Sequence, residues 1–304
     1  MSDMAKQTEK VPFMDSIWGQ FFSDFFSNPM AVIGLIGFFL VVFVAIFATQ
    51  IAPQNPYDLT QLDFMDGNLK PGSTSASGFT FVLGSDDQGR DVLSGIMFGL
   101  RTSLVIGAAS AFLGLIIGSA VGLTSSWFGG RVDTIIMRIV EIQMSFPPIL
   151  IALILLAVLG QGIGKIVVAM VLAQWAYYAR TIRSLALTEK KREYIDAARC
   201  LRYSQPRIIF RHLLPNCLPP LIVIVTMQVA HAIALEATLS FLGIGVPITK
   251  PSLGLLIANG YQFMQSGRYW LSVYPGLALL FTIVSINLVG DHLRDILNPR
   301  TRQQ

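Results

Sequence analysis

The sequence predicts an all-α integral membrane protein with six transmembrane helices. Of its 304 residues, 53% are hydrophobic and only 13% are charged, whereas soluble domains carry roughly 25% charged residues. Uncharged apolar runs of about 20 residues recur along the chain, and a helix of that length crosses the roughly 30 Å hydrocarbon layer of a bilayer. Between these runs, lysine and arginine gather in a few segments. These observations exclude an ordinary soluble domain.

The first two expected spans are free of charged residues, and they cover residues 30–49 and 103–124. A cleavable signal peptide is not expected, because the first apolar run is too long and begins too far from the N-terminus. Within residues 1–29, Phe13, Ile17, Phe21 and Phe25 recur every fourth position. This spacing indicates an amphipathic helix lying in the membrane interface. The alternative is a simple extension of the first span.

Four further spans complete the expected set. Residues 142–164 are uncharged but contain Pro147 and Pro148, which membrane helices tolerate where neighbours satisfy the freed carbonyl groups. Residues 166–179 are too short to span alone, but they reach residue 187 if the intervening arginines extend to the headgroups. The last two spans are expected at residues 218–235 and 271–290.

The distribution of basic residues predicts the orientation. With the N-terminus in the cytoplasm, 16 of the 22 lysine and arginine residues fall on the cytoplasmic side, as the positive-inside rule requires. The expected layout of this cell inner (plasma) membrane protein begins with a cytoplasmic segment 1–29 and an extracytoplasmic loop 50–99. A transmembrane core 100–290, which contains the cytoplasmic loop 188–216, and a cytoplasmic tail 291–304 follow. The net charge of +4 then lies at membrane edges and needs no nucleic-acid partner.

The cytoplasmic loop contains the stretch EYIDAARCLRYSQPRIIFRHLLPN, which is basic and polar. Tyr194, Ala197, Ala198 and Leu201 follow helical spacing and predict an apolar face on a short amphipathic helix. Pro206 is well placed to begin a second helix, because its ring suits the first turn. Two alanines on the apolar face permit close approach of another surface. The plain alternative is a solvated charged connection.

The spacing in this loop resembles the EAA loop of ABC-type import permeases, E-A-A-x3-G-x9-I-x-L-P. Here Asp196-Ala197-Ala198 is followed after three residues by Arg202, and after nine more by His212-Leu213-Leu214-Pro215. The chain departs from the pattern at Asp196, Arg202 and His212. Arginine at the glycine position conflicts with a tight turn, because a left-handed backbone disfavours side chains other than glycine.

Three other segments resemble the C-type subunit of dipeptide and oligopeptide permeases. They are LGSDDQGRDVLSGIMFGLRTSL, LSFLGIGVP and NLVGDHLRDILNPR. The resemblance implies the type I ABC importer permease fold with a cytoplasmic coupling helix. It also implies a second permease subunit, two cytoplasmic ATPase subunits that hold the ATP and Mg, and an extracytoplasmic solute-binding protein. This chain is expected to bind no cofactor, since Gly160–Ile166 lacks the spacing of a phosphate loop.

By this resemblance, the loop docks on an ATPase subunit and transmits its motion. The residues implied in coupling are Glu193, Asp196, Ala197, Ala198, Arg202, Leu214 and Pro215. Ala197→Asp or Ala198→Glu is expected to uncouple transport from ATP hydrolysis without preventing membrane insertion.

Inside the membrane, few residues suggest a function. His231 and Glu236 are candidates for the translocation path, because polar groups are costly there. Of these, only His231 is expected to lie deep, and Glu236 is expected near the outer end with water close by. Gly114, Gly118 and Gly122 recur every fourth residue and predict tight helix packing, within the chain or against a partner. Neither a metal site, a disulfide nor a catalytic group is expected, so an enzyme is not expected.

The expected function is therefore transport, as the permease subunit of an ATP-driven peptide importer. Permeases of the same family for nickel complexes or glutathione are alternatives. A secondary transporter driven by an ion gradient is a rival from another class, but the inverted repeats and paired intramembrane charges of such proteins are not evident. An integral membrane enzyme is a third possibility.

Overall fold

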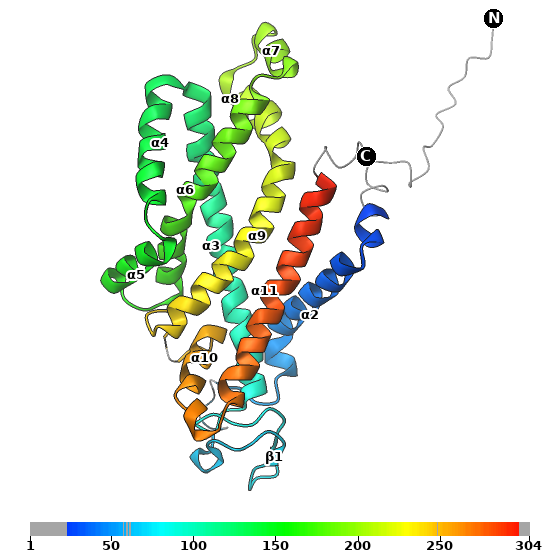
Figure 1. Cartoon of the computed structure of the whole chain (residues 1–304), viewed down its shortest axis with the longest axis vertical. Helices are drawn as coiled ribbons and strands as arrows, with labels where there is room; N and C mark the ends of the chain where they lie inside the picture. Colours follow the sequence, from blue (N-terminus) through cyan, green and yellow to red (C-terminus); the bar gives the residue numbers. More distant parts are fainter. Residues whose placement is uncertain (1–22, 57, 59, 61, 248, 298–304) are drawn as a thin grey trace, which may run out of the picture.

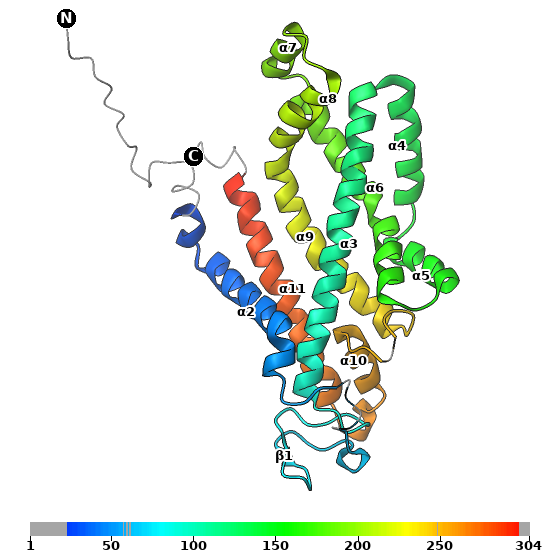
Figure 2. The same ribbon diagram turned by 180° about the vertical axis from the view of Figure 1, so that it is seen from behind.

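The computed structural model describes residues 23–297 except 57, 59, 61 and 248. Its helices run mostly lengthwise in one elongated bundle (Figures 1 and 2). The α-helices are α2 (Pro29–Ile51), α3 (Val92–Phe128), α4 (Gly130–Met144), α5 (Pro148–Leu159), α6 (Ile163–Glu189), α7 (Glu193–Cys200), α8 (Gln205–Ile208), α9 (Leu214–Phe241), α10 (Leu253–Tyr261) and α11 (Trp270–Leu297). Short 3₁₀ turns cover Phe64–Asp66 and Met264–Ser266, and a π-helical turn covers Ile209–Leu213.

The two ends of the bundle differ in structure. One end carries α7, and we call it the α7 end; the other, the hairpin end, carries α10 and a small antiparallel hairpin of β1 (Ser73–Thr74) and β2 (Thr80–Phe81) (Figure 1). The start of α2 meets the end of α11 at the same end as α7. There, the His292 ring lies 3.3 Å from the amide nitrogen of Asn28 and 3.2 Å from the carbonyl oxygen of Asp24. Residues 23–27 are helical, and the remainder of the expected interfacial helix lies outside the described residues.

Among the described residues, four helices are long and apolar enough to cross a membrane: α2, α3, the continuous run Gln205–Phe241, and α11. The helix α6 is long enough at 27 residues, but Arg180 and Arg183 interrupt its apolar sequence. The first, second, fifth and sixth expected spans therefore have single long helices in their places, each longer than its apolar core. The fourth expected span also has a helix in its place, α6, whose two ends reach beyond the apolar residues 166–179.

The third expected span was wrong in form. Residues 142–164 do not make one helix: α4 ends at Met144, and α5 restarts at Pro148 and leaves at an angle of 86°. Figures 1 and 2 show α4 beside α3 and α6, with α5 turning off the line of α4. Pro147 and Pro148 supply no N–H groups, and the residue before a proline avoids the α conformation, so the helix stops here. Arg131 and Arg138 lie on α4.

Two buried clusters hold the bundle together along its length. One joins α3, α5, α6 and α9 around Ile106, Leu156 and Met170. The other joins α2, α3, α10 and α11 around Val41, Leu253 and Trp270. Both clusters include α3, so this helix is the central element of the bundle.

Candidate functional site

The helix α7 stands at one end of the molecule, on the loop between α6 and α9 (Figure 1). Its first turn carries Glu193 and Asp196, and its last turn carries Arg199. Acidic residues at the N-terminus and a basic residue at the C-terminus both favour the helix dipole. Arg199 also pairs with Asp196 at 3.1 Å, although both side chains are substantially exposed. Such an exposed pair contributes less than about 1 kcal/mol.

One face of α7 is buried in the chain itself. Ile195 is fully buried and Ala198 is 4% exposed. They pack in a cluster with Ile182 and Ala186 of α6 and with Cys217 of α9. Both flanking helices contribute to this cluster, so α7 packs against their ends.

The two alanines do not share a face, which corrects the sequence-based interpretation. Ala198 belongs to the buried side, whereas Ala197 is exposed, together with Asp196 and Leu201. Leu201 is 66% exposed. The outward face of α7 is therefore formed by Glu193, Asp196, Ala197 and Leu201. Because Ala198 is buried, the substitution Ala198→Glu would disrupt the cluster beneath α7, and its effect could not be assigned to a partner surface.

Arg202 adopts the strained conformation that the family pattern assigns to glycine. Its φ is +54°. The Arg202 amide donates to the Arg199 carbonyl at 2.9 Å, and the Tyr203 amide donates to the Ala198 carbonyl at 3.2 Å. These two bonds form a Schellman motif, the usual left-handed end of a helix. The tight turn is thus retained despite the arginine, at a cost of about 1–2 kcal/mol for a left-handed L-residue.

The second half of the loop joins α9 without a break. Gln205 begins α8 with Pro206 in its first turn, as the sequence predicts, and the π-helical turn Ile209–Leu213 connects it to α9. The His212 ring stacks on Tyr203, with centroids 5.7 Å apart. Leu214 is half-buried beneath the loop, while Pro215 is exposed.

Polar contacts fix the loop to the neighbouring helix ends. The Lys190 ammonium donates to the carbonyl oxygens of Ser126 at 3.0 Å and Trp127 at 2.7 Å, in the last turn of α3. Its partial burial lowers the pKa of Lys190. The Tyr194 hydroxyl donates to Glu189 at 2.8 Å, and burial raises the pKa of Tyr194. These contacts connect the loop that carries α7 to the ends of α3 and α6.

The glycine ridge of α3 packs against α6 inside this chain. A Cβ on Gly118 would lie 2.7 Å from the Trp175 carbonyl oxygen, and one on Gly122 would lie 3.1 Å from the Arg183 amide nitrogen. Gly114 faces the ring of Tyr178, 3.1 Å from its nearest atom. The sequence left open whether this ridge packs within the chain or against a partner, and in the structure it packs within the chain, against α6.

The two expected translocation-path residues have different environments. Glu236 is fully buried, not near water as the sequence suggested. It accepts hydrogen bonds from Ser103 and Ser240, both at 2.6 Å, and so ties α9 to α3. His231 is exposed, and its Nδ1 lies 3.0 Å from the Met227 carbonyl of its own helix. His231 therefore faces a groove, whereas Glu236 is part of the contact between α9 and α3.

Sequence reasoning missed that groove. It lies between the α4–α5 break, α6 and α9, and it has a volume of about 520 Å³. Its lining includes Gln174, which is 7% exposed. A single glutamine within the apolar run 166–179 was the available signal, because an uncharged polar side chain at that depth requires a partner.

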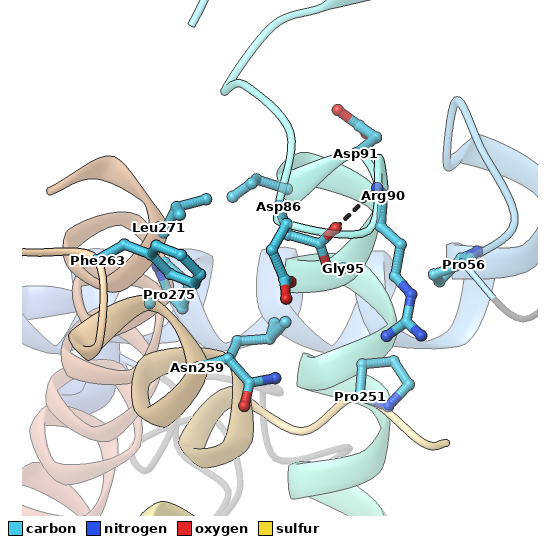
Figure 3. Close-up of a pocket in the computed structure, with 14 residues that line it drawn as sticks. Pro56, Asp86, Arg90, Asp91, Gly95, Pro251, Asn259, Phe263, Leu271 and Pro275 are labelled. Atoms are coloured by element: carbon cyan, nitrogen blue, oxygen red, sulfur yellow. Dashed lines mark hydrogen bonds between the residues drawn. The ribbon is translucent and has the colours of Figure 1, made fainter. Parts of the chain in front are cut away.

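A second, much smaller cavity lies at the hairpin end. Figure 3 shows Asp86 and Arg90, from the loop before α3, opposite Asn259 and Phe263. Its volume is about 30 Å³, the space of one water molecule. The Asp86 carboxylate accepts from the amides of Gln88 at 2.9 Å and Arg90 at 2.8 Å. This cavity is too small for a peptide, and no group of three metal-binding side chains occurs in the described part of the chain.

Comparison with known proteins gives the family. Residues 91–303 match the model of the binding-protein-dependent transport system inner membrane component, and residues 16–71 match the N-terminal transmembrane domain of oligopeptide transport permease C. The dipeptide transport system permease protein DppC of Escherichia coli (strain K12) is 41% identical over 93% of both chains. DppC of Haemophilus influenzae is 35% identical over 93% of this chain and 95% of that protein.

A solved structure has the same fold. It is an inward-facing form of the MetNI methionine ABC transporter, with a TM-score of 0.53 and 21% identity, covering 65% of this chain and 94% of that one. At this identity the match concerns the fold alone. The long family match, the identity to the peptide permeases and the fold agree, and the chain belongs to the family of binding-protein-dependent transport system inner membrane components.

Proposed function

We propose that this chain is a membrane-spanning permease subunit of an ATP-driven importer of dipeptides or oligopeptides. The α7 end then lies in the cytoplasm with both termini, and the hairpin end lies outside. Two ATPase subunits, a second permease subunit and a solute-binding protein complete the transporter. The names of the relatives favour peptides over nickel complexes or glutathione.

The two-sided packing of α7 carries this proposal. Its inner face is built into the ends of α6 and α9 through Ile195 and Ala198, while Ala197 and Leu201 remain exposed. We take this exposed leucine and the small residue beside it, on a helix packed against the chain from beneath, as the surface that enters a cleft on a partner subunit. A helix held in this way passes on the displacement of its partner as a rigid-body movement.

The test compares two charge substitutions in the reconstituted complex. Ala197→Asp places a carboxylate on the outward face of α7, where docking would bury it without a partner. Thr188→Asp adds the same charge to an exposed position on α6, outside α7. ATP-driven peptide uptake and co-purification of the ATPase subunit are measured in parallel with membrane insertion.

Ala197→Asp is expected to reduce uptake at least tenfold with normal insertion, and Thr188→Asp is expected to retain uptake. Normal uptake by Ala197→Asp would refute docking through α7. Equal losses in both variants would assign the effect to surface charge instead.

A further inference from the structure

Arg101 is a cation at the edge of a membrane span without a charged partner in the chain. It lies on α3, two positions before the uncharged run 103–124, and its side chain is exposed. Within the described part of the chain it takes part in no ion pair. Ionisable side chains in transmembrane segments are costly, and they usually pair with another group. The charge of Arg101 is therefore left to water or to a group from outside the chain.

A cavity at the hairpin end brings a second cation to the same opening. Arg101 and Lys250 both line this cavity, which has a volume of about 500 Å³, and none of its lining residues is Asp or Glu. Lys250 is exposed as well, and it forms no ion pair with the described residues. A guanidinium group can bind two oxygens of one phosphate through parallel hydrogen bonds. We call this opening the cationic cavity, and its charge favours an anion.

An apolar groove continues from the cationic cavity, between α2, α3, α9 and α11. The groove and the cavity share Arg101 and Val105, and the groove has a volume of about 480 Å³. Among its described lining residues, the one other polar side chain is Thr226, whose hydroxyl donates to the Val223 carbonyl at 2.7 Å. A hydrocarbon chain can therefore fill the groove without burying an unpaired polar side chain.

The apolar groove runs from Arg101 toward the middle of the membrane. Its α2 wall reaches from Ile46 to Phe38, a distance of roughly 12 Å along a helix. The hydrocarbon of one leaflet is about 15 Å deep, half of the roughly 30 Å of the bilayer core. Figures 1 and 2 show α2 and α11 diverging from α3 and α9 in the same direction, toward the α7 end. The groove therefore has about the depth of one leaflet.

The apolar groove and the groove beside the α4–α5 break lie on different faces of α9. Val229 lines the first, and His231 lines the second. Two positions along a helix are about 200° apart around its axis. A molecule in the apolar groove is therefore separated by α9 from the groove that contains His231.

We propose that the cationic cavity and the apolar groove together hold one anionic phospholipid. Its phosphate lies at Arg101 and Lys250, and one acyl chain lies in the apolar groove. Basic pockets between transmembrane helices bind anionic lipid headgroups in this way. A zwitterionic lipid also carries a phosphate, but its ammonium group would meet the same two cations, so the site selects lipids with a net negative charge.

A lipid titration of the purified complete transporter tests the role of charge. Native mass spectrometry counts the lipid molecules that stay bound, and it gives dissociation constants for phosphatidylglycerol and for phosphatidylcholine with the same acyl chains. Arg101→Gln removes the guanidinium and keeps a polar side chain. Lys165→Gln is the matched control, because it removes an exposed cation in the first turn of α6 that lines neither the cavity nor the groove.

The unmodified transporter is expected to bind phosphatidylglycerol about tenfold more tightly than phosphatidylcholine. Arg101→Gln is expected to weaken phosphatidylglycerol binding about tenfold, the size of one charge-assisted hydrogen bond, whereas Lys165→Gln is expected to leave it unchanged. Equal affinities for the two lipids, or equal effects of the two substitutions, would overturn the proposal.

The headgroup without its chains separates a lipid site from a site for a soluble anion. Glycerol phosphate is expected not to displace phosphatidylglycerol at equal concentration, because it cannot occupy the apolar groove. Displacement by glycerol phosphate would assign the cationic cavity to a soluble anion and overturn the proposal.

A change in the groove itself keeps the test decisive if Arg101→Gln does not assemble. Ala108 is exposed and lines the apolar groove, so Ala108→Phe fills the groove and leaves Arg101 in place. Ala120→Phe makes the same change at an exposed position of α3 outside the groove and the cationic cavity. Ala108→Phe is expected to weaken phosphatidylglycerol binding about fivefold or more through lost chain contacts, and Ala120→Phe is expected to leave it unchanged. Unchanged binding by Ala108→Phe would show that no acyl chain lies in the groove.

Discussion

The glycine ridge of α3 predicts a graded response to the addition of a single methyl group. Gly118→Ala would place Cβ 2.7 Å from the Trp175 carbonyl oxygen and 2.9 Å from the Ala179 amide nitrogen. Carbon contacts are most favourable at about 3.5–4.0 Å, so the helices must separate by several tenths of an ångström. The nearest atom is the Cβ of Tyr178, whose position the backbone fixes, and the next two belong to the backbone of α6, so none of them can rotate away.

Two opposing contributions determine how much each substitution changes the free energy of unfolding. Alanine gains about 1 kcal/mol over glycine in a helix interior, whereas overpacking a tight contact costs about 1–3 kcal/mol or more. Gly276 of α11 supplies the matched control, because a Cβ there meets nothing within 4 Å. Gly114 is intermediate, since its nearest neighbour at 3.1 Å is the ring of Tyr178, a side chain that can adjust.

Thermal unfolding of the purified chain in detergent measures the series. Gly276→Ala is expected to raise the melting temperature slightly, Gly114→Ala to change it little, and Gly118→Ala to lower it by several degrees, at about 2–4 °C per kcal/mol. If Gly118→Ala melts at or above the temperature of Gly276→Ala, the close α3–α6 contact does not exist as described.

Two further predictions concern the loops at the ends of the bundle. Arg202→Gly relieves the left-handed strain after α7, and the greater conformational freedom of glycine in the unfolded chain offsets part of this gain. The net stabilisation of about 1 kcal/mol should slow hydrogen exchange of the Tyr203 amide up to about fivefold. Faster exchange would show that the arginine itself stabilises the turn. Burial raises the pKa of Asp86 above its usual 3.8, so the folded state favours the protonated carboxyl, and its contribution to stability falls as the pH rises from 3.8 through the folded pKa. Asp86→Asn keeps the acceptor for the Gln88 and Arg90 amides. This variant should therefore melt at a higher temperature than the unmodified chain at pH 7, and at the same temperature below about pH 3.8. A lower melting temperature of the variant at pH 7 would show that the charge of Asp86 is stabilising.

Apolar run length and the spacing around Asp196-Ala197-Ala198 were sufficient to predict the membrane class and the loop that carries α7. They were insufficient where packing decides. Ala197 and Ala198 are about 100° apart on a helix, and only the positions of α6 and α9 determine which of them is buried. Pro147 and Pro148 indicate an interruption, but the 86° bend depends on the helices that receive α5.

Contacts between distant segments were also beyond the sequence. Glu236 is buried because Ser103, 133 positions earlier, lies beside it, and no local pattern reports such a neighbour. At Arg202 the residue type predicted the wrong backbone conformation. An arginine disfavours a left-handed turn, but Arg202 adopts one, and two backbone hydrogen bonds at the end of α7 accompany it.

The position of the tight contact along α3 has a mechanical consequence. At 1.5 Å per residue, the 37 residues of α3 form a rod of about 55 Å. Gly118 divides it into a short arm of roughly 15 Å toward Phe128 and a long arm of roughly 39 Å toward Val92. A rigid rod pivoting there works as an unequal lever. A shift of 1 Å where Lys190 contacts Ser126 and Trp127, roughly 13 Å from Gly118, would move the opposite tip by roughly 3 Å, the ratio of the two distances from the pivot.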